Sequence, residues 1–208
     1  MRTEFGVIVG AGRETGEGDI RWGADLFIMP FHKIFATRPH GAHMWVPMDD
    51  ESTMLYSIDF YPDRPLEDEV LERSQSWLHI HTENMPGTDR VAQNRDNDYM
   101  IDRVLQASGR SYTGLKGLGV QDCAIQESMG PIADRTIEHL GASDLGIIQV
   151  RRTLLQALKD HEQGRTLPGL EPTSYRMRST RFNLPPGGSF RDAVMRQLRD
   201  LLSRDAAE

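Results

Sequence analysis

Short apolar runs separated by turn-forming residues dominate the first sixty residues of the chain. Runs rich in aromatic and β-branched residues are typical of strands, and polar or glycine-rich segments between them are typical of turns. Strands are predicted at Phe5 to Gly10, Leu26 to Phe35, His43 to Met48 and Met54 to Phe60, with turns at Gly12 to Asp19 and Met48 to Ser52. This part of the chain is therefore predicted to be an antiparallel meander.

Helical spacing of apolar residues replaces this pattern beyond Pro62. The longest predicted helix runs from Ser143 to Gln163, with an apolar stripe made of Leu145, Ile148, Leu154, Leu155 and Leu158. Other helices are predicted over Pro65 to Gln75, from an N-cap at Asp98 to a stop at Gly109, and from Ser189 onward, with one more strand within Arg176 to Pro185. Strands and helices without βαβ alternation predict an α+β fold.

Composition excludes two classes of partner. The chain has 208 residues, enough for one domain with a proper core, and a formal net charge of −7. A nucleic-acid surface needs clustered positive charge, so no nucleic acid is expected as a partner. No run approaches the roughly 18 apolar residues of a membrane helix, and the N-terminus lacks a signal-peptide pattern, so no membrane contact and a cytoplasmic location are expected.

Histidines supply only weak metal-binding patterns. His79 and His81 flank Ile80 and lie near Glu83, and residues two apart share one face of a strand. Such His-x-His pairs are more often surface or structural residues than ligands, and the same holds for His40 and His43. The single histidines, which are expected on helix or strand surfaces, are His32, His139 and His161.

Several sequence blocks in a fixed order carry a family resemblance. They are HMWVPMDDE at His43 to Glu51, YPDRPL at Tyr61 to Leu66, NRDNDYMIDR at Asn94 to Arg103, the Tyr-Thr-Gly turn at Tyr112 to Gly114, QDCAIQESMGPIADR at Gln121 to Arg135, and EHLG at Glu138 to Gly141. Together they resemble the C-terminal part of the catalytic domain of a Rieske non-haem iron, aromatic ring-hydroxylating oxygenase large subunit, in the phthalate dioxygenase-like branch. The resemblance spans about Thr3 to Leu184.

This resemblance implies a fold and a chemistry. The fold is helix-grip (START-like), a curved antiparallel β-sheet packed on long C-terminal helices. The chemistry is O2-dependent oxidation of an aromatic, often acidic, substrate at a mononuclear Fe(II) held by two histidines and one carboxylate. Asp122 takes the position of the carboxylate ligand, whereas spacing alone allows it to be only the N-cap of a helix over Cys123 to Ser128.

Other positions follow from the same resemblance. Asn97 and Gln121 are candidates to orient the ligating carboxylate. Four residues are expected to border the substrate pocket: Ile8, Ile28, Phe31 and Trp45.

The remaining metal ligands are missing from the chain. The family's two iron-binding histidines precede the first strand of the sheet, where this chain has no such pair. A Rieske [2Fe–2S] cluster needs two Cys and two His, whereas Cys123 is the one cysteine, expected to be a small buried hydrophobe. Residues 1–208 are therefore expected to form a single, partial oxygenase catalytic domain that lacks the Rieske domain and binds no 2Fe–2S cluster.

Three interpretations stay open. The chain is the C-terminal portion of an oxygenase or O-demethylase, a non-catalytic START-like small-molecule binding protein, or an accessory subunit of a two-polypeptide oxygenase. The partners expected at family level are an aromatic small molecule, O2, a Rieske- and His-bearing N-terminal portion, and a reductase. A homo-oligomer is compatible with each interpretation.

Overall fold

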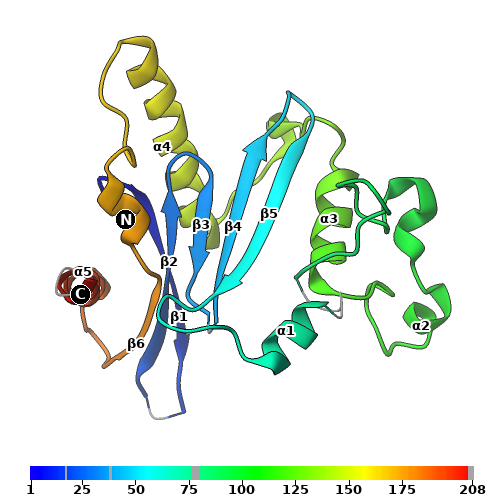
Figure 1. The fold of residues 1–208 in the computed structure, drawn as a ribbon, viewed down its shortest axis with the longest axis horizontal. Coiled ribbons are helices and arrows are strands. Elements are labelled where there is room, and N and C mark those ends of the chain that lie inside the picture. Colours follow the sequence, from blue (N-terminus) through cyan, green and yellow to red (C-terminus); the bar gives the residue numbers. More distant parts are fainter. Residues whose placement is uncertain (17, 38, 76–79, 206–208) are drawn as a thin grey trace. The chain divides into compact units, whose positions relative to one another are not determined.

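The computed structural model of the chain describes residues 1–16, 18–37, 39–75 and 80–205, which form two compact units (Figure 1). Unit 1 comprises Met1–Val46, Thr53–Pro62 and His139–Glu208 and contains a sheet and two long helices. Unit 2 comprises Pro47–Ser52 and Asp63–Glu138 and contains shorter helices.

Unit 1 is built on an open, six-stranded antiparallel sheet. Five strands are neighbours in chain order, β1 (Gly6–Glu14), β2 (Ile20–Ile28), β3 (His32–Phe35), β4 (His40–Pro47) and β5 (Thr53–Phe60), and β6 (Thr180–Leu184) pairs with β2. The predicted meander is confirmed. The prediction of one strand from Leu26 to Phe35 is wrong, because a turn at residues 29–31 separates β2 from β3. Pro30 in this turn has no N–H to donate to a strand ladder.

Two long helices cover opposite faces of β1. In α4 (Leu145–Glu162), a Cβ added at Gly146 would lie 2.7 Å from Cγ1 of Val9. At the start of α5 (Phe190–Asp205), the ring of Phe190 would lie 2.5 Å from a Cβ added at Gly10. Val9 and Gly10 are consecutive in β1, so they face opposite sides of the sheet. β1 is therefore held between α4 and α5.

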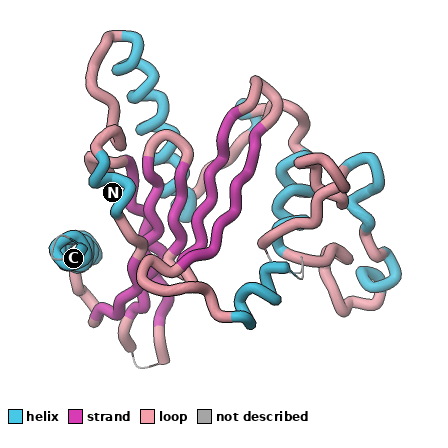
Figure 2. The backbone as a smooth tube through the Cα atoms, in the orientation of Figure 1, coloured by secondary structure: helices cyan, strands magenta, loops and turns pink. Residues whose placement is uncertain are grey.

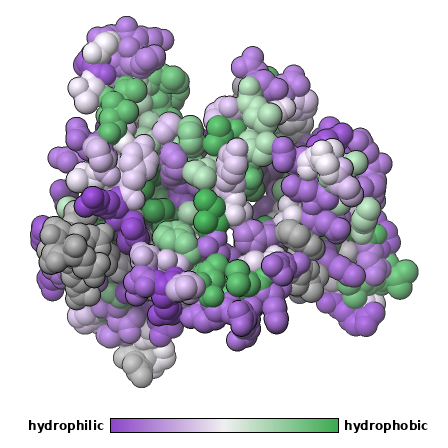
Figure 3. Space-filling view, in the orientation of Figure 1, coloured by the Kyte–Doolittle hydropathy of each residue, from purple (hydrophilic) through white to green (hydrophobic). Residues whose placement is uncertain are grey.

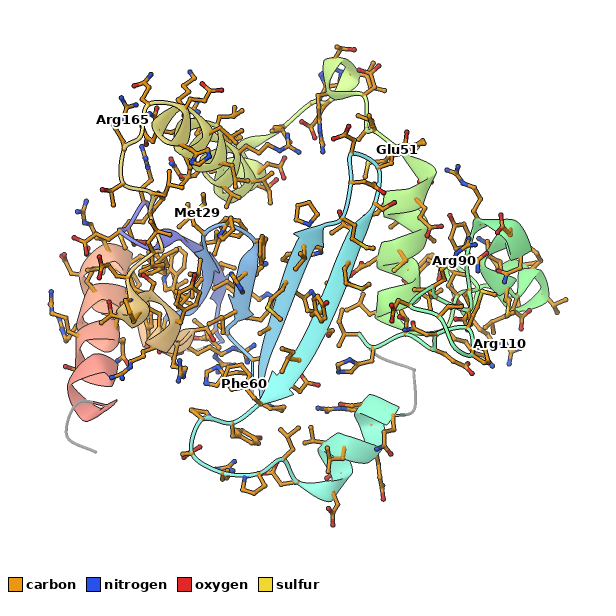
Figure 4. The ribbon with its side chains drawn as sticks, turned by 45° about the horizontal axis from the view of Figure 1, so that its top comes forward. Met29, Glu51, Phe60, Arg90, Arg110 and Arg165 are labelled. Atoms are coloured by element: carbon orange, nitrogen blue, oxygen red, sulfur yellow. The ribbon has the colours of Figure 1, made fainter. Side chains whose placement is uncertain are left out.

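The main hydrophobic core lies on the α5 side of the sheet. Side chains of β1, β2 and β3 meet the buried face of α5 there: Phe5, Ile8, Ala24, Leu26, Ile28, Ile34, Val194 and Leu198. Phe60, labelled in Figure 4 at the end of β5, packs against this cluster and stacks on His40 with ring centroids 5.5 Å apart. Burial of these side chains is the main favourable contribution to the stability of unit 1.

The predicted helix from Ser143 to Gln163 is confirmed, but its fully buried residues are small ones and not the predicted stripe of large residues, of which only Ile148 and Leu154 are half-buried. After the 3₁₀ turn η3 (Ala142–Asp144), α4 buries Thr153 and Ala157, whereas Leu155 and Leu158 are exposed. Apolar side chains are visible along α4 in Figure 3. Small residues let α4 approach the sheet closely, and this leaves much of its leucine stripe in solvent.

The C-terminal part of unit 1 follows the predicted order. A 3₁₀ turn, η4 (Pro172–Arg176), precedes the predicted strand, which is β6. Ser189 opens the last helix as predicted, because its hydroxyl accepts a hydrogen bond from the backbone N–H of Asp192 at 3.2 Å.

Unit 2 consists of short helices joined by long loops (Figure 2). They are α1 (Asp68–Gln75), the 3₁₀ turn η1 (Arg95–Met100), α2 (Arg103–Ala107), α3 (Leu118–Ser128) and the 3₁₀ turn η2 (Arg135–Ile137). The prediction that Asp98 is an N-cap is wrong. Asp98 has φ +50°, whereas an N-cap needs extended backbone, and the N-cap of α2 is Asp102, whose carboxylate accepts the N–H of Leu105 at 2.8 Å.

The fold class predicted from the sequence is confirmed as α+β, with an antiparallel sheet and long C-terminal helices. Among the helices of the described residues, none combines the length and apolar composition needed to span a bilayer.

Candidate functional site

Asp122 lies inside helix α3, not at its beginning. The helix starts at Leu118, with Gly117 as the N-cap residue, and it continues to Ser128. Asp122 therefore lies in the second turn, where its side chain cannot satisfy the first free N–H groups of the helix. The interpretation of Asp122 as the N-cap of a helix over Cys123 to Ser128 is wrong.

The carboxylate of Asp122 stands in an apolar stripe. Leu118, Ile125 and Met129 lie four residues before and three and seven residues after it, so all four share one face of α3. The three apolar side chains are 49%, 63% and 52% exposed, and Asp122 is exposed as well. Within the described part of the chain, the Asp122 carboxylate makes no hydrogen bond or ion pair. This face of α3 therefore presents a solvent-exposed carboxylate, without a protein partner among the described residues, between apolar side chains, and we call it the Asp122 stripe.

The opposite face of α3 is packed. Gly119 and Val120 are buried, and a Cβ added at Gly119 would lie only 2.1 Å from the carbonyl oxygen of Ile80. The close approach to the backbone at Ile80 fixes which side of α3 faces inward, and so it fixes which side carries Asp122.

Cys123 is a half-buried free thiol beside Asp122. Burial raises the pKa of the Cys123 thiol above its ordinary value, and the charges of Glu127 and Asp122 raise it further. A raised pKa keeps the protonated, less nucleophilic form at neutral pH. These surroundings fit the predicted inert side chain better than a reactive one.

The turn at Asn94 to Met100 is strained and held by Asn94. Three consecutive residues, Asp98, Tyr99 and Met100, have φ between +50° and +55°, a left-handed conformation that costs roughly 1–2 kcal/mol for each L-residue. The buried Asn94 side chain accepts from the N–H of Asp96 at 3.0 Å and donates to the carbonyl of Val91 at 2.9 Å. Such strain persists only where the surroundings over-determine it, often at functional sites.

This turn is connected to α3 through Tyr99. The Tyr99 hydroxyl donates to Oε2 of Glu127 at 2.9 Å, and the guanidinium of Arg95 donates to the backbone carbonyl of Glu127. Burial and the hydrogen bond to Glu127 raise the pKa of Tyr99. Arg90, which precedes this turn and is labelled in Figure 4, pairs with Asp96 of the turn at 3.2 Å. The sequence indicated this block only through the family resemblance, and the roles of Tyr99 and Glu127 were missed.

The residues expected to orient Asp122 have other neighbours. Asn97 accepts from the backbone N–H of Asn94 at 3.0 Å and donates to the carbonyl of Ala92 at 2.7 Å. Gln121 is half-buried and adjacent to Asp122 in α3. Their proposed role on a ligating carboxylate stays a prediction.

The histidines of unit 1 have structural surroundings. His40 is 3% exposed, with Nδ1 3.0 Å from the hydroxyl of Ser179. His43 is buried between the rings of Phe35 and Trp45. Burial lowers the pKa of His32.

Among the remaining histidines, those within the described residues complete no metal site. His79 lies outside the described residues; His81 is half-buried, and Glu83, His139 and His161 are exposed. Over residues 1–16, 18–37, 39–75 and 80–205, no three His, Cys, Asp or Glu side chains are grouped to hold a metal ion.

The predicted pocket residues are divided between two environments. Ile8 and Ile28 are each 1% exposed and belong to the main core. Phe31 stacks near His32, and its carbonyl accepts the N–H of Trp45 at 3.1 Å. A cavity of about 310 Å³ lies between β1 and α4, and of the predicted pocket residues Ile8 lines it, together with Val9, Gly146 and Arg152 among others.

An open antiparallel sheet and long C-terminal helices make the described residues an α+β domain. Residues 24–181 match the protein family described as LigXa C-terminal domain like, and the chain belongs to this family.

Two curated relatives match a similar share of the chain. The 3-chlorobenzoate-3,4-dioxygenase oxygenase subunit of Comamonas testosteroni is 36% identical over 137 residues, which cover 61% of this chain and 32% of that subunit. The phthalate 4,5-dioxygenase oxygenase subunit of Pseudomonas putida is 35% identical over 134 residues, covering 62% of this chain and 29% of that subunit. The matches thus span about a third of the relatives' length. They confirm the resemblance seen in the sequence and place the chain in a ring-hydroxylating oxygenase family.

Proposed function

We propose that this chain is the C-terminal portion of the catalytic domain of a Rieske-type aromatic-ring oxygenase or O-demethylase, in which Asp122 is the carboxylate ligand of a mononuclear Fe(II). The observation that carries this proposal is the Asp122 stripe, where an exposed carboxylate without a partner lies among exposed apolar side chains. A carboxylate in such surroundings needs a compensating charge once the face is covered. A divalent iron supplies that charge.

Among the described residues no three His, Cys, Asp or Glu side chains are grouped to hold a metal ion, so Asp122 is proposed as one ligand of a set that is otherwise supplied elsewhere. Three ligands on one face are needed for this type of iron site. We therefore propose that the two histidines and the 2Fe–2S cluster come from a Rieske- and His-bearing portion outside these residues, and we assign no reaction step to this chain alone.

The broader features of the proposal follow from the relatives. Both are named for aromatic carboxylates, chlorobenzoate and phthalate, so an aromatic acid is proposed as the substrate, with O2 as co-substrate and a reductase as electron source. A single partial catalytic domain over residues 1–208 and a cytoplasmic location complete the proposal.

A chimera tests the iron assignment. The matched segment of the Comamonas testosteroni subunit is replaced by the corresponding segment of this chain, and iron per subunit and O2 consumption with 3-chlorobenzoate are measured. Asp122→Ala is expected to lower iron affinity by more than the about 10–100-fold cost of removing an outer-shell partner. Asp89→Asn, at an exposed carboxylate elsewhere in unit 2, is the matched control and should leave iron content unchanged.

Two results would contradict the proposal. One is full iron content in the Asp122→Ala chimera. The other is near-stoichiometric Fe(II) binding by the isolated chain, which would show that its own residues complete a site.

A further inference from the structure

The two faces of the unit 1 sheet differ in chemistry. The α5 side is the apolar core, with Leu26, Ile28 and Ile34 among its members. Because side chains alternate along a strand, the neighbouring residues point to the other side. On that side β2, β3 and β4 carry a connected group, which we call the aromatic row: Asp25, Lys33, Phe35, His43 and Trp45.

Lys33 is positioned by Asp25 and Phe35. Its Nζ lies 3.3 Å from Oδ2 of Asp25 and 4.4 Å from the centroid of the Phe35 ring. The other oxygen of Asp25 accepts the backbone N–H of Ala36 at 2.8 Å, so the carboxylate is fixed in orientation. The two charged side chains are 29% and 28% exposed, for Lys33 and Asp25 respectively. The charge of Lys33 is therefore held in a defined place with access to solvent.

The ammonium of Lys33 keeps hydrogen-bonding capacity. An ammonium group has three N–H donors. Within the described residues, the ion pair with Asp25 uses one of these donors of Lys33. Asp25, in contrast, is satisfied on both oxygens. A ligand that accepts hydrogen bonds thus has a donor available on Lys33, whereas a cationic ligand would be repelled by the Lys33 ammonium.

Aromatic rings continue from Lys33 to Phe35 on β3 and then to His43 and Trp45 along β4. The Phe35 and His43 centroids are 4.8 Å apart, and those of His43 and Trp45 are 5.3 Å apart, both with edge-to-face geometry. Interlocked rings of this kind are rigid and offer flat apolar surface at little entropic cost. Trp45 is half-buried, so part of this surface is accessible.

We propose that the aromatic row binds an aromatic carboxylate, with the carboxylate on the Lys33 ammonium and the aromatic ring against Trp45 and its neighbours. This inference rests on the proposed function, and it adds the residue that selects for an acid. Asp25 has a second role, because its negative charge competes with the ligand for Lys33 and moderates the affinity.

Benzoate and benzamide titrated into the 208-residue chain, followed by calorimetry, test the proposal. Lys33→Met is expected to weaken benzoate binding about tenfold, the range of one charge-assisted hydrogen bond, and to leave benzamide binding unchanged. Lys33→Arg retains the donors and should retain benzoate binding. Lys159→Met removes an exposed lysine on α4 and serves as the matched control.

Asp25→Asn gives the sharpest prediction. Removing the competing charge should strengthen benzoate binding and leave benzamide unaffected, whereas a merely structural role for Asp25 predicts weaker binding of both. Three outcomes overturn the proposal: no benzoate binding by the unaltered chain, equal losses of benzoate and benzamide in Lys33→Met, or weaker benzoate binding in Asp25→Asn.

The outcome is independent of the iron assignment. Benzoate binding that depends on Lys33, together with full iron content in the Asp122→Ala chimera, would keep the aromatic row and remove the proposed iron ligand. The reverse combination would keep the iron ligand and remove the aromatic row.

Discussion

Replacing Gly119 with alanine should loosen helix α3, although alanine normally stabilises helices. The propensity gain is at most about 1 kcal/mol. The added Cβ would lie 2.1 Å from the carbonyl oxygen of Ile80 and 2.9 Å from Cγ2 of Thr82. The nearest atom belongs to the backbone and cannot rotate away, so the upper part of the usual overpacking cost, about 3 kcal/mol, applies.

The two contributions leave a net loss of about 2 kcal/mol in the stability of α3 against local opening, which corresponds to a roughly 30-fold change in the opening equilibrium. Hydrogen-deuterium exchange measured by mass spectrometry on peptides covering Leu118–Ser128 reports this quantity directly. Exchange in α3 should accelerate by about that factor, while peptides of unit 1 stay unchanged.

Gly16→Ala is the control, because no atom lies within 4 Å of its added Cβ and exchange should be unaffected. Slower or unchanged α3 exchange in Gly119→Ala would show that the helix does not pack on Ile80 as described. The orientation of the Asp122 stripe would then lose its support.

Three further predictions concern packing, the strained turn and the thiol. Leu198→Ala in the core should cost about 2–5 kcal/mol in chemical denaturation, whereas Leu155→Ala on the exposed side of α4 should change the free energy of unfolding by less than about 0.5 kcal/mol. Asn94→Ala removes the side-chain hydrogen bonds that hold the left-handed turn, and this should lower the stability of the turn by about 1–3 kcal/mol. Limited proteolysis at the turn should then be faster, and unchanged cleavage would contradict the role of Asn94. Because the pKa of Cys123 is raised, its alkylation near pH 8 should be slower than that of unfolded protein, and Glu127→Gln, by lowering the pKa, should accelerate it.

Local patterns predicted the strands well because alternation and turn residues act over a few positions. The meander and the strand within Arg176 to Pro185 follow from such signals. The division of Leu26 to Phe35 at Pro30 was a local signal as well, and the apolar run around it concealed the turn.

Errors in the helices have a tertiary cause. Aspartate is a residue type that often serves as an N-cap. The φ of Asp98, however, is set by the contacts of Asn94 and by the hydrogen bond from Tyr99 to α3. Glycine has a low helix propensity, so Gly119 argues against a helix that begins at Leu118. The close approach of α3 to the backbone of Ile80 nevertheless requires a glycine at this position. Neither contact can be inferred from spacing.

The candidate site was predicted only in part for a related reason. The resemblance identified Asp122, but its setting among Leu118, Ile125 and Met129 depends on where α3 begins. The pairing of Lys33 with Asp25 requires the β2–β3 register, which the sequence did not resolve. The resemblance predicts Trp45 as a pocket residue, but its connection to Lys33 through Phe35 and His43 depends on the strand register.

The packing of β1 between two helices sets an order of events during synthesis. Val9 and Gly10 are synthesised before their partners Gly146 and Phe190, which follow only after all of Asp63–Glu138 has been made. Such distant pairings are slow to form, and an incomplete sheet exposes apolar surface in the meantime. The contacts within Asp63–Glu138 join residues closer in sequence than those of β1 with α4 and α5. This segment is therefore able to fold before α4 and α5 have been synthesised. A nascent chain is consequently most vulnerable to aggregation in the interval before α5 emerges.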